Sequence, residues 1–189
     1  MYAIHEDQNG QLLLGTQGGL NRFEPNNKQY LPYLPEYFNN RFIYKIFEDS
    51  QNGFWICVNF SDTIYYMDPG GTISSYRYTN PEDNYPGSIG VISACEDSNG
   101  IMWFGTMNYG LVKFDPKTKV FRNYTVEDGL SNNYVYGVLQ TDGKQELWLS
   151  TNKGLCRFNI EKEQFSNYNI SHGLPNNQFN FKSAYKDED

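Results

Sequence analysis

Short apolar stretches separated by Gly, Pro, Asp and Asn run along the whole chain. Segments such as YVYGVLQ at 134–140 and ELWLS at 146–150 are brief and rich in aromatic and β-branched residues. This pattern is typical of β-strands, whereas an amphipathic helix repeats its apolar residues at spacings of three and four and contains little Gly or Pro. The sequence therefore predicts an all-β protein.

The same pattern recurs four times, at 4–25, 46–69, 94–116 and 138–160. Each copy has a large apolar residue at the same position, namely Leu13, Trp55, Trp103 and Trp148. Successive members of this set are 42, 48 and 45 residues apart. An aspartate stands six residues earlier in each copy: Asp7, Asp49, Asp97 and Asp142. A period of 40–50 residues built from strands is typical of β-propellers, in which each repeat forms one four-stranded blade.

We therefore predict a partial propeller of about four antiparallel blades, spanning 1–38, 39–87, 88–131 and 132–175, with the first strand of a fifth blade at 176–186. In the third blade the expected strands are 91–96, 102–106, 111–115 and 120–124. In the fourth blade they are 135–140, 146–150, 155–160 and 164–168. The three tryptophans should be buried at equivalent places on second strands, as periodic large aromatics packed between blades.

Turn residues mark the first hairpin of each repeat. Asp97-Ser-Asn-Gly100 combines residues that favour a bend with a glycine that accepts positive φ, and Asp7-Gln-Asn-Gly10 repeats it. In the second repeat the glycine comes one residue later, at Gly53, which predicts an inserted residue and a bulged turn. Because a Glu-Asp pair recurs at this turn in three of the repeats, we interpret the aspartates as structural rather than catalytic.

Charge and cysteine content exclude several classes of protein. The net charge is -7 and no basic stripe is visible, so we expect no contact with nucleic acid. No apolar stretch approaches the ~20 residues of a membrane span, and no signal peptide is present in this segment. The three cysteines, Cys57, Cys95 and Cys156, form no CxxC pair and lie in apolar strands, so we expect small buried side chains.

The repeats resemble the two-component regulator propeller repeat, whose pattern is roughly E-D-x-x-G-x-[LI]-W-[IVL]-G-T-x-x-G-L-x-[RK]-F-[DN]. The third copy, EDSNGIMWFGTMNYGLVKFDP, follows that pattern almost throughout, and the first and fourth are close. The second departs from it, because Cys57-Val58-Asn59 replaces Gly-Thr and no glycine precedes Ile64.

The resemblance implies the extracytoplasmic, periplasmic sensor portion of a bacterial hybrid histidine kinase, of which this chain is a fragment. Such sensors often respond to oligosaccharides, so an oligosaccharide or similar small ligand is the expected partner, and the kinase would lie outside this chain. The remaining blades, or a second copy of the chain, are further expected partners. Four blades are few for a closed ring, so we expect the isolated chain to associate through its terminal blades.

Loops between second and third strands, and loops between blades, should share one face of the propeller, which is the default ligand site. Amide and aromatic side chains suited to sugar binding occur in these loops, and they include Phe60, Asn108, Tyr109, Tyr134, Asn152 and Lys153. We expect no cofactor, metal or catalytic residue, because the histidines His5 and His172 occupy unrelated repeat positions. The alternatives are a protein-interaction or dimerisation scaffold and a propeller lyase resembling the streptogramin lyases.

Overall fold

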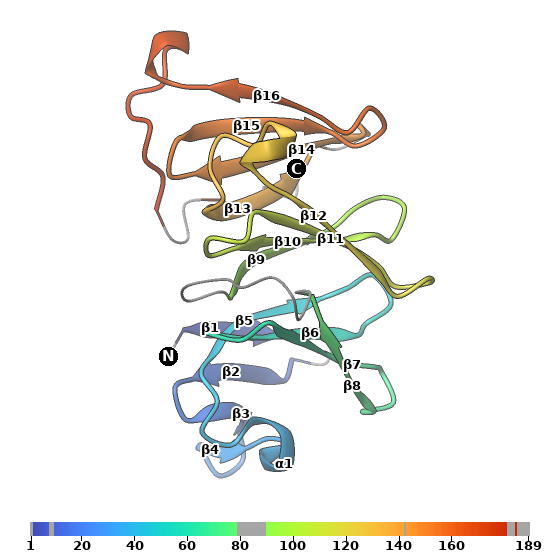
Figure 1. Cartoon of the computed structure of the whole chain (residues 1–189). Helices are drawn as coiled ribbons and strands as arrows, with labels where there is room; N and C mark the ends of the chain where they lie inside the picture. Colours follow the sequence, from blue (N-terminus) through green and yellow to red (C-terminus); the bar gives the residue numbers. More distant parts are fainter. Residues whose placement is uncertain (1, 8–9, 79–89, 142, 181–183, 185–189) are drawn as a thin grey trace. The chain divides into compact units, whose positions relative to one another are not determined.

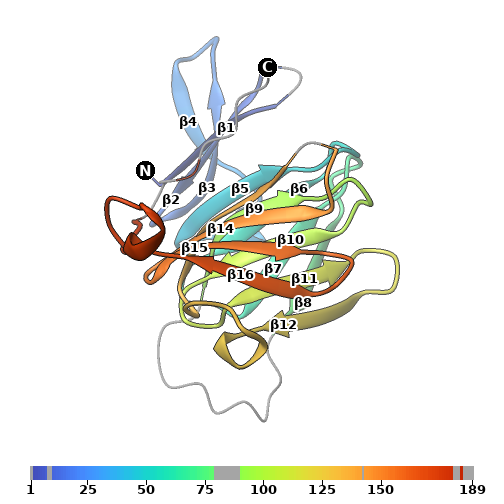
Figure 2. The same cartoon turned by 90° about the horizontal axis from the view of Figure 1, so that it is seen from above.

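The computed structural model describes residues 2–7, 10–78, 90–141, 143–180 and 184. The chain divides into two compact units, Met1–Asn84 and Tyr85–Asp189, which are described separately below. The described residues form four four-stranded antiparallel sheets, two in each unit, and this confirms the predicted partial propeller (Figures 1 and 2).

Unit 1 contains the first two blades. The first sheet consists of β1 (Ala3–Glu6), β2 (Leu12–Thr16), β3 (Gly19–Glu24) and β4 (Gln29–Pro32). A short helix, α1 (Pro35–Phe38), leads to the second sheet of β5 (Ile43–Glu48), β6 (Phe54–Val58), β7 (Thr63–Met67) and β8 (Ile73–Arg77). In each sheet neighbouring strands pair in chain order.

Unit 2 contains the third and fourth blades. The third sheet consists of β9 (Val91–Glu96), β10 (Met102–Thr106), β11 (Leu111–Asp115) and β12 (Val120–Tyr124). The 3-10 turn η1 (Val126–Asp128) connects it to β13 (Val135–Gln140), β14 (Glu146–Thr151), β15 (Gly154–Asn159) and β16 (Gln164–Tyr168), which is followed by η2 (Ile170–His172). The third-blade strands match the prediction residue for residue, and those of the fourth blade differ by no more than one residue at any end.

A hydrophobic core lies between the two sheets of each unit. In unit 1, Leu13 and Leu20 of the first blade pack with Ile56 and Met67 of the second. In unit 2, Trp103 of the third blade packs with the apolar face of the fourth, and its ring centroid lies 5.5 Å from that of Phe158. The tryptophan-bearing face of the third blade is therefore directed at the fourth.

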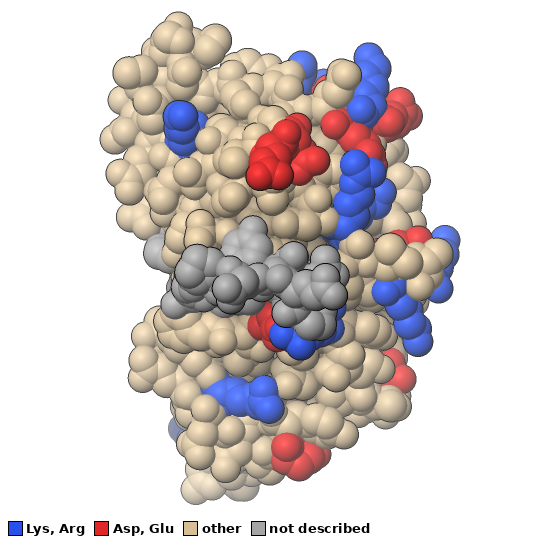
Figure 3. Space-filling view, viewed as in Figure 1, with Lys and Arg blue, Asp and Glu red and all other residues tan. Residues whose placement is uncertain are grey.

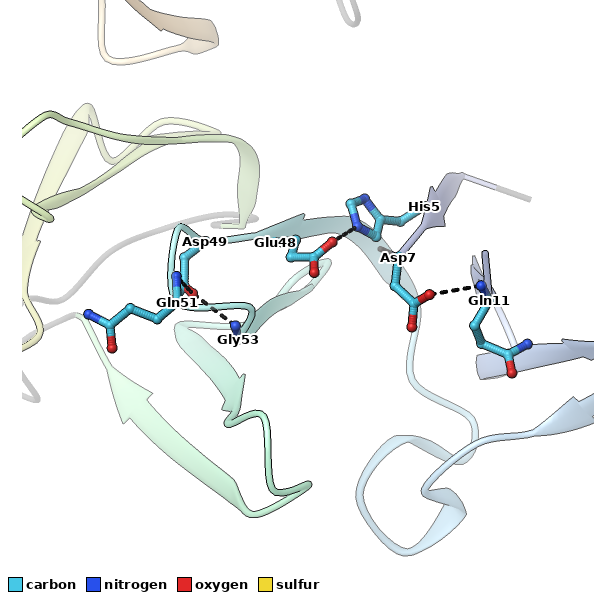
Figure 4. A network of polar contacts seen from close by, with 7 residues as sticks. All are labelled: His5, Asp7, Gln11, Glu48, Asp49, Gln51 and Gly53. Atoms are coloured by element: carbon cyan, nitrogen blue, oxygen red, sulfur yellow. Dashed lines mark hydrogen bonds and ion pairs between the residues drawn. The ribbon is translucent and has the colours of Figure 1, made fainter. Parts of the chain in front are cut away.

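The recurring aspartates hold the first hairpin of a blade and the indole that follows it. Asp97 Oδ1 accepts the backbone N–H groups of Asn99 and Ile101, and Asp97 Oδ2 accepts Trp103 Nε1–H at 2.8 Å. Asp49 Oδ1 accepts the N–H groups of Gln51 and Gly53 in its own turn (Figure 4). Asp49 Oδ2 accepts Trp55 Nε1–H at 2.9 Å. The six-residue spacing seen in the sequence is thus a hydrogen bond across the hairpin.

The second hairpin contains no inserted residue, so the predicted bulge is wrong. Asn52 has a φ of 64° and donates its N–H to the Asp49 carbonyl, as Gly100 does to Asp97. Gly53 occupies the next position, where a Cβ would overlap the ring of Tyr66. Asparagine tolerates the left-handed conformation, so the glycine is needed one residue later for space rather than for φ.

The three tryptophans lie on second strands as expected, yet they differ in burial. Trp55 and Trp103 are 2% and 0% exposed, whereas Trp148 is only partly buried, which differs from the expectation of a third buried indole. Leu147 and Leu149 face the core of unit 2, so Trp148 points to the opposite side of the sheet. No sheet of unit 2 covers that side among the described residues.

Two predicted features fall on residues that the structure does not describe. Asp142 lies outside the described part of the chain. Of the expected fifth-blade strand at 176–186, residues 176–180 and 184 are described and carry no strand assignment, while the others lie outside.

Candidate functional site

Each sheet presents two loop edges, which we name by what they carry. The connection edge carries the turns between second and third strands and the segments that join one blade to the next. The hairpin edge carries the remaining turns. The predicted ligand residues belong to connection edges, with Phe60 in unit 1 and the other five in unit 2.

Two capped 3-10 turns build the connection edge of unit 2. Thr125 Oγ1 accepts the N–H of Glu127, while Asp128 accepts the N–H of Thr125 at 2.8 Å. After β16 the same arrangement recurs, with Asn169 as the cap and His172 in the place of Asp128. Gly129 and Gly173 end the two turns in the left-handed conformation, with φ of 103° and 90°.

An asparagine fastens each of these connections to the rest of the fold. Asn133 Oδ1 accepts the N–H of Val126 at 2.9 Å, and its backbone carbonyl accepts the N–H of Gly110. Asn177 makes the equivalent contacts with Ile170, at 2.8 Å, and with Gly154. The repeated Gly-Leu-x-Asn-Asn sequence is thus a structural clamp.

A cleft of about 680 Å³ opens between these two connections. We call it the amide cleft, because asparagine side chains dominate its polar lining. Its residues are Val126, Gly129, Leu130, Ser131, Asn132, Lys153, Asn167, Tyr168, Asn169 and Asn177. Of the predicted ligand residues, the structure brings Lys153 alone into this cleft.

A partly buried network holds one wall of the amide cleft. Asn167 Nδ2 donates to the Gly129 carbonyl at 2.9 Å, and its Oδ1 accepts the Cys156 thiol. Ser131 Oγ contacts both Cys156 Sγ and Thr151 Oγ1, at 2.9 and 2.8 Å. Burial raises the pKa of the Cys156 thiol, so it remains a neutral donor in this network.

Other polar groups of the amide cleft remain available to a ligand. The side-chain Nδ2 groups of Asn132 and Asn177 donate to none of the described residues, since both side chains bond through Oδ1. Lys153 is exposed, forms no ion pair within the described chain, and is the one charged residue of the lining. Tyr168 adds an aromatic ring to the same cleft.

A second group of predicted residues lies at the start of β13. The rings of Tyr134 and Tyr136 have centroids 5.1 Å apart, and Tyr136 donates its hydroxyl to Asn152 Oδ1 at 2.8 Å. Burial raises the pKa of both tyrosines, so their hydroxyls stay protonated at neutral pH. Tyr134 and Asn152 therefore share one polar and aromatic group, linked by a tyrosine that sequence reasoning did not name.

The remaining predicted residues lie in the turns between second and third strands. Asn108 is exposed and has a φ of 64°, which suits a turn-forming asparagine. Tyr109 is 3% exposed, so its burial disfavours a role in stacking against a ligand. Phe60, in unit 1, is 64% exposed and also has a positive φ, of 56°.

Sequence reasoning missed most of the amide cleft. Asn132 and Asn177 belong to the two copies of the Gly-Leu-x-Asn-Asn sequence, at 129–133 and 173–177, and that repetition was the available signal. Asn167 and Tyr168 end an outer strand, where no local pattern distinguishes a cleft residue from an ordinary one.

The hairpin edge of unit 1 carries a smaller pocket of about 340 Å³. Asp7 and Glu48 line it, together with Arg22, which pairs with Glu24 and lies over the ring of Tyr33. The same carboxylates serve the fold, because Asp7 caps its turn through the N–H of Gln11 and Glu48 accepts His5 Nε2 at 2.8 Å (Figure 4).

The described residues offer little for a metal ion or, on the face shown in Figure 3, for a strongly charged partner. No group of three or more His, Cys, Asp or Glu able to hold a metal ion occurs among the described residues. On the face shown in Figure 3, acidic and basic side chains are interspersed within each unit. In the part of the chain that the structure describes, helices are too short and too polar to cross a membrane.

One segment of the chain is similar to a known family. The family model described as "Two component regulator propeller" matches residues 84–108. No curated protein matches the chain.

Solved structures share the fold. The extracellular domain of a protein described as a hybrid two component system from B. thetaiotaomicron aligns with a TM-score of 0.73 and 20% identity, over 93% of this chain and 24% of that one. Virginiamycin B lyase from Staphylococcus aureus aligns with a TM-score of 0.65 and 18% identity, over 88% and 54%. PorZ from Porphyromonas gingivalis aligns with a TM-score of 0.65 and 15% identity, over 93% and 28%. The chain thus spans about a quarter of the extracellular domain that it matches.

Proposed function

We propose that this chain is part of the extracytoplasmic sensor of a two-component signalling protein, and that it binds an oligosaccharide or a similar small ligand. The observation that carries the proposal is the amide cleft, which lies at the connection edge where a ligand site was expected. The ligand would signal to a kinase outside this chain.

The chemistry of the cleft supports a polyhydroxylated ligand. The amide donors of Asn132 and Asn177 and the Lys153 ammonium can donate to sugar hydroxyls, and Tyr168 offers a ring face. Binding sites for small molecules commonly combine such a surface with a few convergent polar groups. Extracellular domains of a hybrid two component system and of a one component system share the fold, which supports a place for this chain in such a signalling protein.

Isothermal titration calorimetry with a defined panel tests this proposal. The panel comprises maltohexaose, cellohexaose, xylohexaose and hexagalacturonate. At least one should bind the wild-type chain, and Lys153→Ala combined with Asn132→Ala should weaken that binding at least tenfold, since two donors are lost. Lys162→Ala provides the matched control, because it removes the same charge from the hairpin edge of the same blade.

A lyase or a scaffold is the alternative function. Streptogramin B lyases share the fold, and a catalytically inactive form of one carries an alanine in place of a histidine. In this chain His5 pairs with Glu48 in unit 1, while His172 caps η2 in unit 2. Metal analysis and a streptogramin turnover assay would support the lyase if positive. A failure of all saccharides to bind would favour the scaffold.

A further inference from the structure

Four aromatic side chains gather at the connection edge of unit 1, away from the amide cleft of unit 2. The Phe42 ring is central to this aromatic platform, with its centroid 4.2 Å from that of Tyr2, 6.0 Å from that of Tyr44 and 6.4 Å from that of Phe60. Tyr2 and Tyr44 also lie stacked at 6.1 Å.

The backbone holds these rings in place. The register shift between Ile43 and Lys45 places Tyr44 at a bulge, beside Phe42. The N–H of Asn59 donates to the Phe42 carbonyl at 2.7 Å, so the turn that carries Phe60 is tied to the strand that carries the platform. Gln17 Nε2 donates to the Tyr2 hydroxyl.

Both the backbone conformation and the exposure of Phe60 are unfavourable for a phenylalanine. Its φ of 56° is unfavourable for a bulky residue, and 64% of its surface remains exposed to water. The equivalent turn of the third blade uses Asn108 at a φ of 64°, which is the low-strain choice. The chain thus bears backbone strain and an exposed apolar ring where asparagine would avoid both.

Polar groups lie at the rim of the platform. The Tyr2 hydroxyl, which accepts a hydrogen bond from Gln17 Nε2, and the Gln17 amide are exposed there. The platform therefore combines flat rings with polar groups that a ligand can reach.

We infer that the aromatic platform binds a pyranose ring of a saccharide, stacked against Phe60 and Phe42. Aromatic faces carry partial negative charge and attract the weakly positive C–H groups on one face of a sugar, while sugar hydroxyls can hydrogen-bond to the exposed Tyr2 hydroxyl and Gln17 amide. The inference rests on the proposed function for its ligand class and adds a second place of binding.

Phe60→Asn and Phe60→Tyr test the inference by calorimetry with the same four hexaoses. For a hexaose that binds the wild-type chain, Phe60→Asn should weaken binding at least tenfold, while Phe60→Tyr, which retains a ring, should stay within about threefold. Unchanged binding by Phe60→Asn, with binding lost in the Lys153→Ala and Asn132→Ala double variant, would overturn the inference and leave the amide cleft standing. Loss confined to Phe60→Asn would support the platform and overturn the cleft. If none of the four binds the wild-type chain, both fail.

Thermal unfolding separates binding from packing. Phe60→Asn should leave Tm unchanged or raise it, because asparagine relieves the strained φ and little packing is lost. A fall in Tm of more than about 4 °C, roughly the shift for 1 kcal/mol or more in a chain of this size, would show that the ring serves the fold and would overturn the inference.

Discussion

At the scale of single residues, the hydrogen bond between an aspartate and an indole explains the most conspicuous spacing in the sequence. Asp97 uses one carboxylate oxygen for the turn and the other for Trp103, so a single side chain fixes both a backbone reversal and a core residue. The same two contacts recur at Asp49, so the acidic residue has a structural role in these two blades.

Asp97→Asn tests this double role. The amide retains an acceptor for the turn, yet it turns an NH₂ group towards Trp103 Nε1–H, so two donors face each other. The loss in unfolding free energy should be about 1–3 kcal/mol, the cost of a buried donor left unpaired, measured by urea denaturation. Asp7→Asn is the matched control and should cost less, because Leu13 offers no indole there. Equal losses would contradict the account.

Trp103→Ala should cost about 3–5 kcal/mol, as large aromatic truncations in a core do. Trp148→Ala should cost clearly less, because that side chain is only partly buried. Urea denaturation of the two variants checks the difference, and a loss below about 1 kcal/mol for Trp103→Ala would show that this indole is not a core residue.

Alkaline pH should destabilise the fold through groups whose neutral forms are buried. Burial raises the pKa of Cys57 from 9.0 to about 12, and that of Tyr66 from 10.0 to about 12. Between those values the unfolded chain loses protons that the folded chain keeps, so stability is complete below about pH 9 and declines as pH rises towards 12. Urea denaturation at a series of pH values should show this decline, and Cys57→Ala should make it shallower.

At the scale of elements, most of the strand pattern followed from turn chemistry. Asp, Asn, Gly and Pro mark where strands end, and the short apolar stretches between these turns leave few possible strand boundaries. For this reason β9 to β12 match the prediction residue for residue. The bulge predicted for the second hairpin was wrong because Asn52, rather than a glycine, takes the positive φ there. Gly53 follows it because a Cβ at that position would overlap the Tyr66 ring, which the sequence alone does not reveal.

The candidate sites were harder to predict than the strands. The amide cleft arises from two connections that are more than thirty residues apart, so no local pattern identifies it. Phe60 was named from its loop, but Phe42, which contacts both Phe60 and Tyr2, directly precedes β5, and Tyr2 directly precedes β1. Bringing them together requires the packing of one blade on the next.

Three glycines at the connection edge should differ in how much stability is lost when each is replaced by alanine. At Gly110 an added Cβ would overlap the Tyr124 carbonyl and φ is 81°, whereas at Gly129 φ is 103° but the nearest atom lies 3.8 Å away. At Gly18 neither obstacle exists. Gly129→Ala should therefore cost about 1–2 kcal/mol from backbone strain alone, Gly110→Ala more than that, and Gly18→Ala less than about 0.5 kcal/mol. Thermal unfolding should rank them in that order.

At the scale of the whole molecule, each unit exposes an apolar sheet face. Ile4 is 59% and Tyr30 is 61% exposed, and both lie on the face of the first sheet that points away from the core of unit 1. In unit 2, Trp148 is partly exposed on the outer face of the fourth sheet. Such surfaces mark places where another blade or another chain would pack.

The isolated chain should therefore associate or aggregate rather than behave as an independent monomer. Light scattering at increasing protein concentration should show a mass above that of one chain, and Ile4→Lys should lower it by placing a charge on the exposed face. A monodisperse monomer with high thermal stability would contradict this prediction.

The positions of the three tryptophans allow intrinsic fluorescence to report on the unfolding of each unit separately. Trp55 is the sole fluorophore of its kind in unit 1, while Trp103 and Trp148 belong to unit 2. Replacing the latter two by phenylalanine leaves emission from the first unit alone, and replacing Trp55 leaves emission from the second. Comparing the two melting midpoints would then reveal whether the units unfold as one cooperative block or in succession, without any attached dye.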